Sequence, residues 1–183
     1  MKRTVWVFGL IAGAILSIMM LITLPFIDEI GHDKGAYIGY TTMVLAFLMI
    51  FVGVKSYRDN VLGGSIGFLR ALSVGLLITA VASACYVGTW LFIYYKITPD
   101  FADKYAAYAV DKVRKSGASQ AEIDEKIKAM EQMKQIYSNP FSNAAVTFLE
   151  PLPVGVLLAV IAAAILRRPG KPEETFTPAL GAG

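Results

Sequence analysis

The chain has very few of the side chains that build metal centres and covalent cross-links. Its 183 residues include one cysteine and one histidine. A single cysteine excludes an internal disulfide framework and a cysteine-based metal cage. A single histidine likewise excludes a histidine-rich metal site. We therefore expect no bound metal and no cofactor.

Charged residues are scarce as well. They form 17% of the sequence, whereas 56% is hydrophobic and the mean hydropathy is +0.56. Soluble domains carry about 25% charged and about 45–50% apolar residues. This composition excludes a simple one-domain soluble enzyme and indicates a membrane protein whose main partner is the lipid bilayer. The net charge of +3 fits a bias in the loops, so we expect no nucleic-acid partner.

Long uncharged stretches predict four transmembrane helices. Three runs, at 4–27, 35–54 and 71–95, each reach the about 20 residues that cross a hydrocarbon core. A fourth run, 151–166, is long enough only if its helix begins near Asn143 and includes Glu150. We predict an all-α integral membrane protein, a four-helix bundle over 1–168, with spans near 5–27, 37–54, 71–95 and 143–166.

The first run has one competing interpretation, a signal peptide with Lys2 and Arg3 as its positive region. Its apolar stretch is much longer than the about 7–15 residues of a signal core. It is also not followed by a cleavage site of small residues. We expect the segment to stay in the protein as a helix.

The distribution of basic residues predicts how the chain is threaded. One set of loops and ends holds most of them: Lys2, Arg3, Lys55, Arg58, Arg70, Arg167, Arg168 and Lys171. The short loop 28–36 on the opposite side holds one lysine and three acids. Since basic loops stay on the cytoplasmic side, we expect both termini and the 55–70 loop in the cytoplasm. Segment 96–142 then lies outside.

The segment 97–140 predicts an outer insertion of two amphipathic helices, at about 99–116 and 119–137. Pro99 and Asp100 follow Thr98 as a good helix start, and Ser119 and Glu122 have the spacing of a capping box. Two roles remain open. The segment either only caps the bundle as a hairpin or extends helices three and four beyond the membrane, or it is an element that binds a partner or gates a substrate. The last residues, 169–183, are rich in proline and glycine and predict a disordered cytoplasmic tail.

Glu150 is the only charged residue inside the predicted spans. A carboxylate there costs a few kcal/mol unless it is protonated or faces the bundle, water or a partner. Pro151 and Pro153 predict a break in the same helix, and broken helices build ion and substrate sites in transporters. The candidate intramembrane polar site therefore consists of Glu150, Tyr40, Thr41 and Tyr86. The alternative is a structural kink whose glutamate hydrogen-bonds a neighbour.

The loop between the second and third spans has a compact motif of polar residues and glycines: Tyr57, Arg58, Asp59, Gly63 and Gly64. No Walker lysine and no preceding strand accompany the glycines, so a phosphate loop is disfavoured. We interpret the motif as a tight interfacial turn in which Arg58 and Asp59 lock the loop or bind lipid head groups. His32 lies among acids in a turn that we expect to be exposed.

Small residues recur at helical spacing on several spans, which predicts close helix contacts within the chain or in a homodimer. The rows are Gly9, Gly13 and Ser17; Gly75, Thr79 and Ser83; Ala84 and Gly88; Gly155, Ala159 and Ala163. Aromatic residues near the predicted membrane surface fit an aromatic belt: Tyr37, Trp90, Tyr94 and Tyr95.

Residues spread over nearly the whole chain carry a family resemblance. They are Gly53-x-Lys55-x-Tyr57-Arg58-Asp59, Gly64-x-Ile66-x-Phe68, Ala71, Gly75-Leu76, Tyr86, Trp90, Pro99-Asp100-Phe101, Tyr105 and Glu150-x-x-Pro153-Val154-Gly155. In this combination the chain resembles a small bacterial membrane family catalogued as domain of unknown function 4199. The resemblance implies a multi-pass, four-span protein of the bacterial cytoplasmic (inner) membrane, from a family without an established activity.

Three classes of function remain open. The first is a non-enzymatic accessory or structural envelope component, alone, as a homodimer or with a membrane-protein partner. The second is a small transporter or ion-coupled carrier that uses Glu150 at the broken helix. The third is a lipid-acting membrane enzyme subunit with Arg58, Asp59 and Arg70 at the inner face. It ranks last, because no second acid, histidine or nucleophile is placed nearby.

Overall fold

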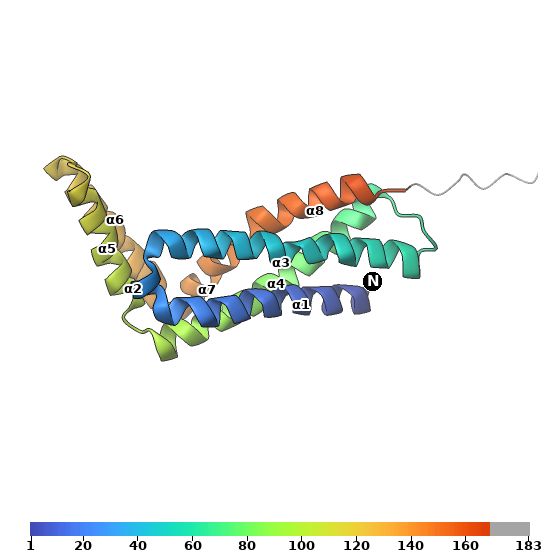
Figure 1. The fold of residues 1–183 in the computed structure, drawn as a ribbon, viewed down its shortest axis with the longest axis horizontal. Coiled ribbons are helices and arrows are strands. Elements are labelled where there is room, and N and C mark those ends of the chain that lie inside the picture. Colours follow the sequence, from blue (N-terminus) through green and yellow to red (C-terminus); the bar gives the residue numbers. More distant parts are fainter. Residues whose placement is uncertain (169–183) are drawn as a thin grey trace, which may run out of the picture.

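Four long apolar helical segments make up most of the protein (Figure 1). The computed structural model describes residues 1–168, in which every regular element is a helix. The segments Lys2–Ile30, His32–Val61, Phe68–Ile97 and Pro140–Leu166 are each long and apolar enough to cross a membrane. The predicted all-α fold with four membrane-spanning helices is confirmed. The predicted tail, 169–183, lies outside the described residues.

The first three spans differ from one another in how they end. The first consists of α1 (Lys2–Thr23), a 3-10 turn η1 (Leu24–Phe26) and α2 (Ile27–Ile30). The second is the single helix α3 (His32–Val61), which extends past the predicted 37–54 because helices continue beyond the hydrocarbon core. The third is α4 (Phe68–Phe92), which ends in a π-helical turn η2 (Ile93–Ile97).

The remaining helices are an inserted hairpin and the fourth span. The hairpin is α5 (Phe101–Lys115) and α6 (Gln120–Ser138), and the span is α7 (Pro140–Leu149) followed by α8 (Leu152–Leu166). A capping box begins α6: Ser119 N–H donates to Glu122 Oε2 at 2.7 Å, and Ser119 Oγ accepts from the Glu122 N–H. The local sequence pattern predicted this helix start correctly.

The small-residue rows are contact surfaces within the chain. Gly9 and Gly13 face α4, where an added Cβ would lie 2.7 Å from Val81 and 2.6 Å from Cys85. A Cβ at Gly75 would lie 2.8 Å from the Cβ of Ala159 on α8. These close approaches hold α1 and α8 against α4. Of the predicted rows, the one at Ala84 and Gly88 stays exposed.

The bundle has two different ends, named here by what they carry. The Arg58 end has the N-terminus and the 62–67 loop, and the hairpin end has α5 and α6 (Figure 1). Arg58 and Arg168 lie at the first of these ends, where they bond Leu166 and Ile66. The larger core cluster lies among α1, α3, α4 and α8; Phe47, Ile50, Val74, Ile78 and Ala162 in it are fully buried.

A smaller core cluster lies toward the hairpin end and includes Trp90 and Tyr94. Both are buried, which contradicts their interpretation as members of an aromatic belt; Tyr37 and Tyr95 are exposed. Trp90 points inward because its indole and its neighbours Phe101 and Tyr137 form an edge-to-face aromatic cluster.

Candidate functional site

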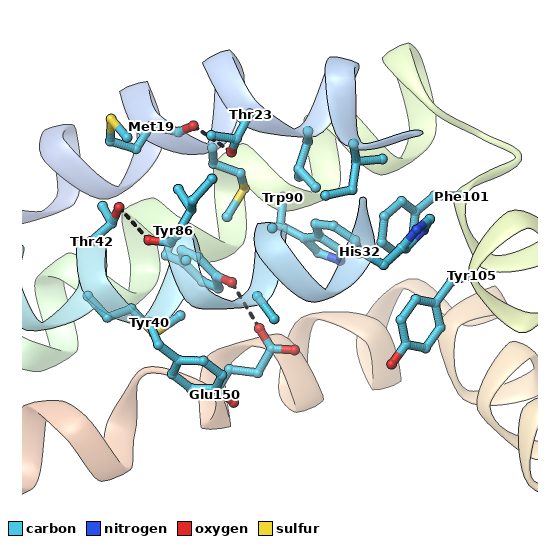
Figure 2. Close-up of a pocket in the computed structure, with 18 of the residues that line it drawn as sticks. Met19, Thr23, His32, Tyr40, Thr42, Tyr86, Trp90, Phe101, Tyr105 and Glu150 are labelled. Atoms are coloured by element: carbon cyan, nitrogen blue, oxygen red, sulfur yellow. Dashed lines mark hydrogen bonds between the residues drawn. The ribbon is translucent and has the colours of Figure 1, made fainter. Parts of the chain in front are cut away.

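A cavity of about 400 Å³ lies in the half of the bundle nearer the hairpin (Figure 2). Residues of α1, α3 and α4 form its walls, the hairpin helices contribute Phe101, Tyr105, Met133 and Tyr137, and Glu150 enters from the fourth span. Most of the lining is apolar or aromatic. Its polar groups include the Glu150 carboxylate, the hydroxyls of several tyrosines and threonines, and His32.

Glu150 lies at the kink of the fourth span. Its Oε2 accepts a hydrogen bond from the Tyr86 hydroxyl at 2.9 Å (Figure 2). The backbone at Glu150 (φ −59, ψ −51) and Pro151 (φ −78, ψ −15) remains in the helical region, so the chain kinks without unwinding. Because proline has no N–H, Pro151 and Pro153 remove the helical donors for the carbonyls of Thr147 and Leu149.

The structure brings three of the four candidate polar residues together. Tyr40, Tyr86 and Glu150 all line the cavity, whereas Thr41 is exposed on the outside of α3. Thr42 takes its place in the lining, with its hydroxyl donating to the Ile38 carbonyl at 2.8 Å. One step along a helix turns a side chain by about 100°, which separates the two neighbouring threonines.

The cavity is open at one side, where the kink separates the fourth span from α3. Helix α8 packs against both α3 and α4, whereas α7 packs mainly against α4 and α6. Tyr40 and Glu150 flank the gap that results, and both side chains are exposed there, Tyr40 by 61%. The opening therefore faces sideways within a membrane-spanning segment.

His32 belongs to the cavity lining, although its sequence position predicted an exposed turn. Its ring stacks on Tyr108, with centroids 4.6 Å apart, and lies 5.6 Å from Tyr105 and 6.3 Å from Phe101. Its Nε2 is buried without a hydrogen-bond partner among residues 1–168. These aromatic neighbours all come from α5, far away in sequence, so no local pattern pointed to them.

Asn143 is the centre of a buried polar network that joins three elements. Its Oδ1 accepts from Trp90 Nε1 at 2.7 Å and from the Thr147 hydroxyl at 3.3 Å, and its Nδ2 donates to the Tyr137 carbonyl at 3.3 Å. Asn143 is fully buried. The sequence pattern placed Asn143 only at the start of the fourth span. An amide side chain beside an apolar run could have indicated this network, because asparagine side chains form hydrogen bonds between membrane helices.

Ion pairs tether the hairpin to the corner between α2 and α3. Lys104 Nζ lies 3.0 Å from Asp28, and Lys112 Nζ lies 2.7 Å from Asp33. Hydrogen bonds to these carboxylates raise the pKa of both lysines. Within the hairpin, Lys134 pairs with Asp103. All of these pairs are solvent-exposed, so each contributes little free energy.

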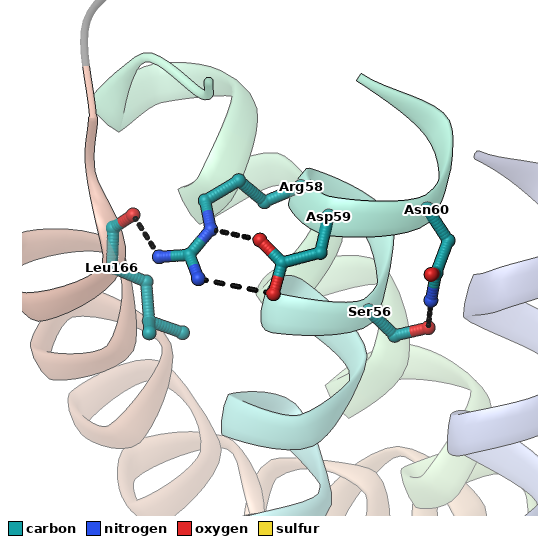
Figure 3. Close-up of polar contacts among 5 residues, drawn as sticks. All are labelled: Ser56, Arg58, Asp59, Asn60 and Leu166. Carbon is teal, nitrogen blue, oxygen red and sulfur yellow. Dashed lines mark hydrogen bonds and ion pairs between the residues drawn. The ribbon is translucent and has the colours of Figure 1, made fainter. Parts of the chain in front are cut away.

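The loop motif at the opposite end of the bundle ties α3 to the end of α8 (Figure 3). Arg58, only 7% exposed, donates to Asp59 at 2.6 Å and 3.1 Å and to the Leu166 carbonyl at 3.3 Å. Ile66 and Arg168 exchange two backbone hydrogen bonds, at 2.8 Å and 2.9 Å.

The glycines of the motif form the turn after α3. Gly63 and Gly64 have φ of 65° and 95°, a region that glycine adopts without strain. Tyr57 is buried beside them. Arg58 and Asp59 therefore bond to each other, and Arg58 also joins α3 to the end of α8.

The site offers one carboxylate, several hydroxyls and aromatic faces. Among residues 1–168, histidine, cysteine and carboxylate side chains nowhere gather in the groups of three that could hold a metal ion. Comparison with the curated proteins and with the solved structures found no match. The family model described as Protein of unknown function (DUF4199) matches residues 7–168. Because this match covers nearly the whole described chain, the protein belongs to the DUF4199 family.

Proposed function

We propose that this protein is a non-enzymatic accessory component of the cytoplasmic membrane that holds a small ligand in the cavity beside Glu150. The observation that carries the proposal is the cavity itself. Its volume of about 400 Å³ is typical of small-molecule sites, which are mostly apolar with a few placed polar groups.

Binding is favoured over transport because the other half of the bundle is closed. Close glycine contacts between α4 and α8 fill the interior there, and Arg58 ties the end of α8 to α3. A carrier needs access to its site from both sides in turn. A small transporter or ion-coupled carrier remains the second candidate, supported by the two helical donors that Pro151 and Pro153 remove beside Glu150.

A lipid-acting enzyme has less support. Of the three residues considered for it, Arg58 and Asp59 use their polar atoms on each other and on the Leu166 carbonyl, and Arg70 is exposed. A catalytic pair needs a group free to meet its substrate. The geometry therefore favours a structural role for this end of the bundle.

The charge distribution supports a threading in which the Arg58 end is cytoplasmic. The start of α1, the end of α3, the start of α4 and the end of α8 lie at that end (Figure 1). They carry Lys2, Arg3, Lys55, Arg58, Arg70, Arg167 and Arg168, whereas α2 and the start of α3 carry Asp28, Glu29 and Asp33. In this orientation the hairpin is extracytoplasmic, and it covers the cavity from outside. Phe101 and Tyr137 contribute to that cover.

Filling the cavity tests the proposal. Gly39 lines it, and a Cβ added there would meet no atom within 4 Å. Gly39→Phe should therefore occupy the cavity while improving helix propensity in α3. The matched control is Leu45→Phe on the same helix, because the Leu45 side chain is 57% exposed and does not line the cavity.

The measurement is native mass spectrometry of the protein released directly from membranes. We expect a small-molecule adduct on the wild type and on Leu45→Phe, and its loss from Gly39→Phe. If the wild type carries no adduct, or if Gly39→Phe keeps it, the proposed binding function is wrong.

A further inference from the structure

We propose that the ligand of this cavity is a small organic cation with an apolar body, held with its ammonium group beside Glu150. This inference rests on the proposed binding function and names the chemical class that the site selects. It follows from the charge, the aromatic walls and the position of the opening.

Among the described residues, the lining has one carboxyl group, that of Glu150, and no lysine or arginine beside it. Glu150 is the only aspartate, glutamate, lysine or arginine that lines the cavity. Within residues 1–168 its carboxylate forms no ion pair with a lysine or arginine, and its hydrogen-bond donor is the neutral Tyr86 hydroxyl. A carboxylate in apolar surroundings is costly unless it is protonated or meets a partner, and a cationic ligand would stabilise its ionised form while an anionic ligand would not.

The walls suit the apolar and cationic parts of such a ligand. Trp90, Phe101, Tyr105 and Tyr137 line the cavity, and aromatic faces attract ammonium groups, quaternary ones above all. A bare divalent metal ion fits poorly, since calcium takes about 6–8 oxygen ligands and the lining has one carboxylate. The unpartnered Nε2 of His32 adds a second polar contact for a longer ligand.

The position of the opening favours entry from within the membrane. Tyr40 and Glu150 flank the opening between α3 and α7. An amine with an apolar body partitions into the membrane and reaches this side without passing the hairpin. The same chemistry is present in a free organic cation and in the amine head group of a lipid.

A tryptophan signal reports binding directly. The chain has two tryptophans; Trp90 lines the cavity, whereas Trp6 is 57% exposed on α1. Trp6→Phe therefore leaves Trp90 as the only reporter. The full chain is titrated in dodecyl maltoside, an uncharged and amine-free detergent, with benzyltrimethylammonium or with neopentylbenzene, its uncharged carbon isostere.

The decisive variant is Glu150→Gln, which removes the charge and keeps an acceptor for the Tyr86 hydroxyl. The matched control is Glu29→Gln, which removes an exposed carboxylate at the same end, away from the cavity. We expect saturable binding of benzyltrimethylammonium that weakens about tenfold or more in Glu150→Gln and stays unchanged in Glu29→Gln. Neopentylbenzene should bind more weakly, and its affinity should be the same in Glu150→Gln.

Other outcomes separate this inference from the proposed function. Equal binding of the two isosteres, unaffected by Glu150→Gln, would overturn the proposal of a cationic ligand. It would indicate an apolar ligand, and the proposed binding function would stand. No response to either probe also overturns the proposal of a cationic ligand. The binding function is then judged by native mass spectrometry alone, as described above.

A competition experiment distinguishes a free organic cation from the amine head group of a lipid. Added phosphatidylethanolamine is compared with galactosyl diacylglycerol, which has no amine. Competition by the first lipid alone identifies a lipid amine as the occupant. Competition by neither supports a free organic cation.

Discussion

The hydrogen bond between Trp90 and Asn143 makes a quantitative prediction about what holds the hairpin end together. It joins α4 to α7 with a donor–acceptor distance of 2.7 Å, and Asn143 is fully buried. Asn143→Leu removes the acceptor while keeping a side chain of similar size. Trp90→Phe removes the donor. The two single variants and their double variant form a thermodynamic cycle.

The magnitude follows from what each variant leaves unpaired. Hydrogen bonds between membrane helices contribute about 0.6 kcal/mol on average and about 1.7 kcal/mol at most. The short and buried Trp90–Asn143 bond should lie in the upper part of that range, with a coupling energy of about 1–1.5 kcal/mol. Asn143→Leu also leaves the Tyr137 carbonyl and the Thr147 hydroxyl without this partner. Its total cost is therefore about 2–4 kcal/mol.

The assay is reversible unfolding by sodium dodecyl sulfate in dodecyl maltoside micelles, followed by the far-ultraviolet circular dichroism of the helices. Thr42→Val is the control, because the Thr42 hydroxyl bonds only a carbonyl of its own helix; it should cost little. A coupling energy below about 0.3 kcal/mol, the scatter of independent sites, would refute the reasoning that this bond joins α4 to α7.

Two further predictions concern the opposite end of the bundle and the hairpin. Arg58→Met removes the donor to the Leu166 carbonyl and leaves the Asp59 carboxylate unpaired. Its unfolding midpoint in the same titration should fall to a lower detergent fraction. Adding Asp59→Asn should recover part of the lost stability. No recovery would contradict a stabilising Arg58–Asp59 pair. Hydrogen bonds from Ser119 lower the pKa of Glu122 below its usual 4.5. The first turn of α6 should then be fully stabilised above that pH and fray as the pH falls through the lowered pKa. A carboxyl carbon NMR titration of Glu122 measures this, and a midpoint at the usual value would contradict the capping box.

Some features were predictable because they depend only on residues close together in sequence. Four apolar runs determine four membrane-spanning helices, since each must satisfy its own backbone hydrogen bonds in lipid. The capping box at Ser119 and the interruption of the fourth span at Pro151 also come from local backbone chemistry. The loop motif at Gly63 and Gly64 belongs to the same group, because a turn with positive φ is a local requirement.

Other features required the packed structure. A membrane helix is apolar on all sides, so its sequence does not show which side faces its neighbours. For this reason Tyr40 and Thr41 were equal candidates for the polar site, and Trp90 and Tyr94 fitted a belt at the membrane surface. Packing decided that Tyr40 lines the cavity, that Thr41 does not, and that both aromatic residues face inward.

By itself the sequence determined that the chain crosses a membrane four times, that an amphipathic hairpin is inserted before the fourth span, and that one carboxylate lies at a kink. Only the tertiary structure decided that this carboxylate borders a cavity and that His32 and Asn143 belong to that half of the bundle. The physical reason is the distance of the contacts along the chain. His32 meets α5, and Asn143 meets Trp90 of α4, only after the helices have packed.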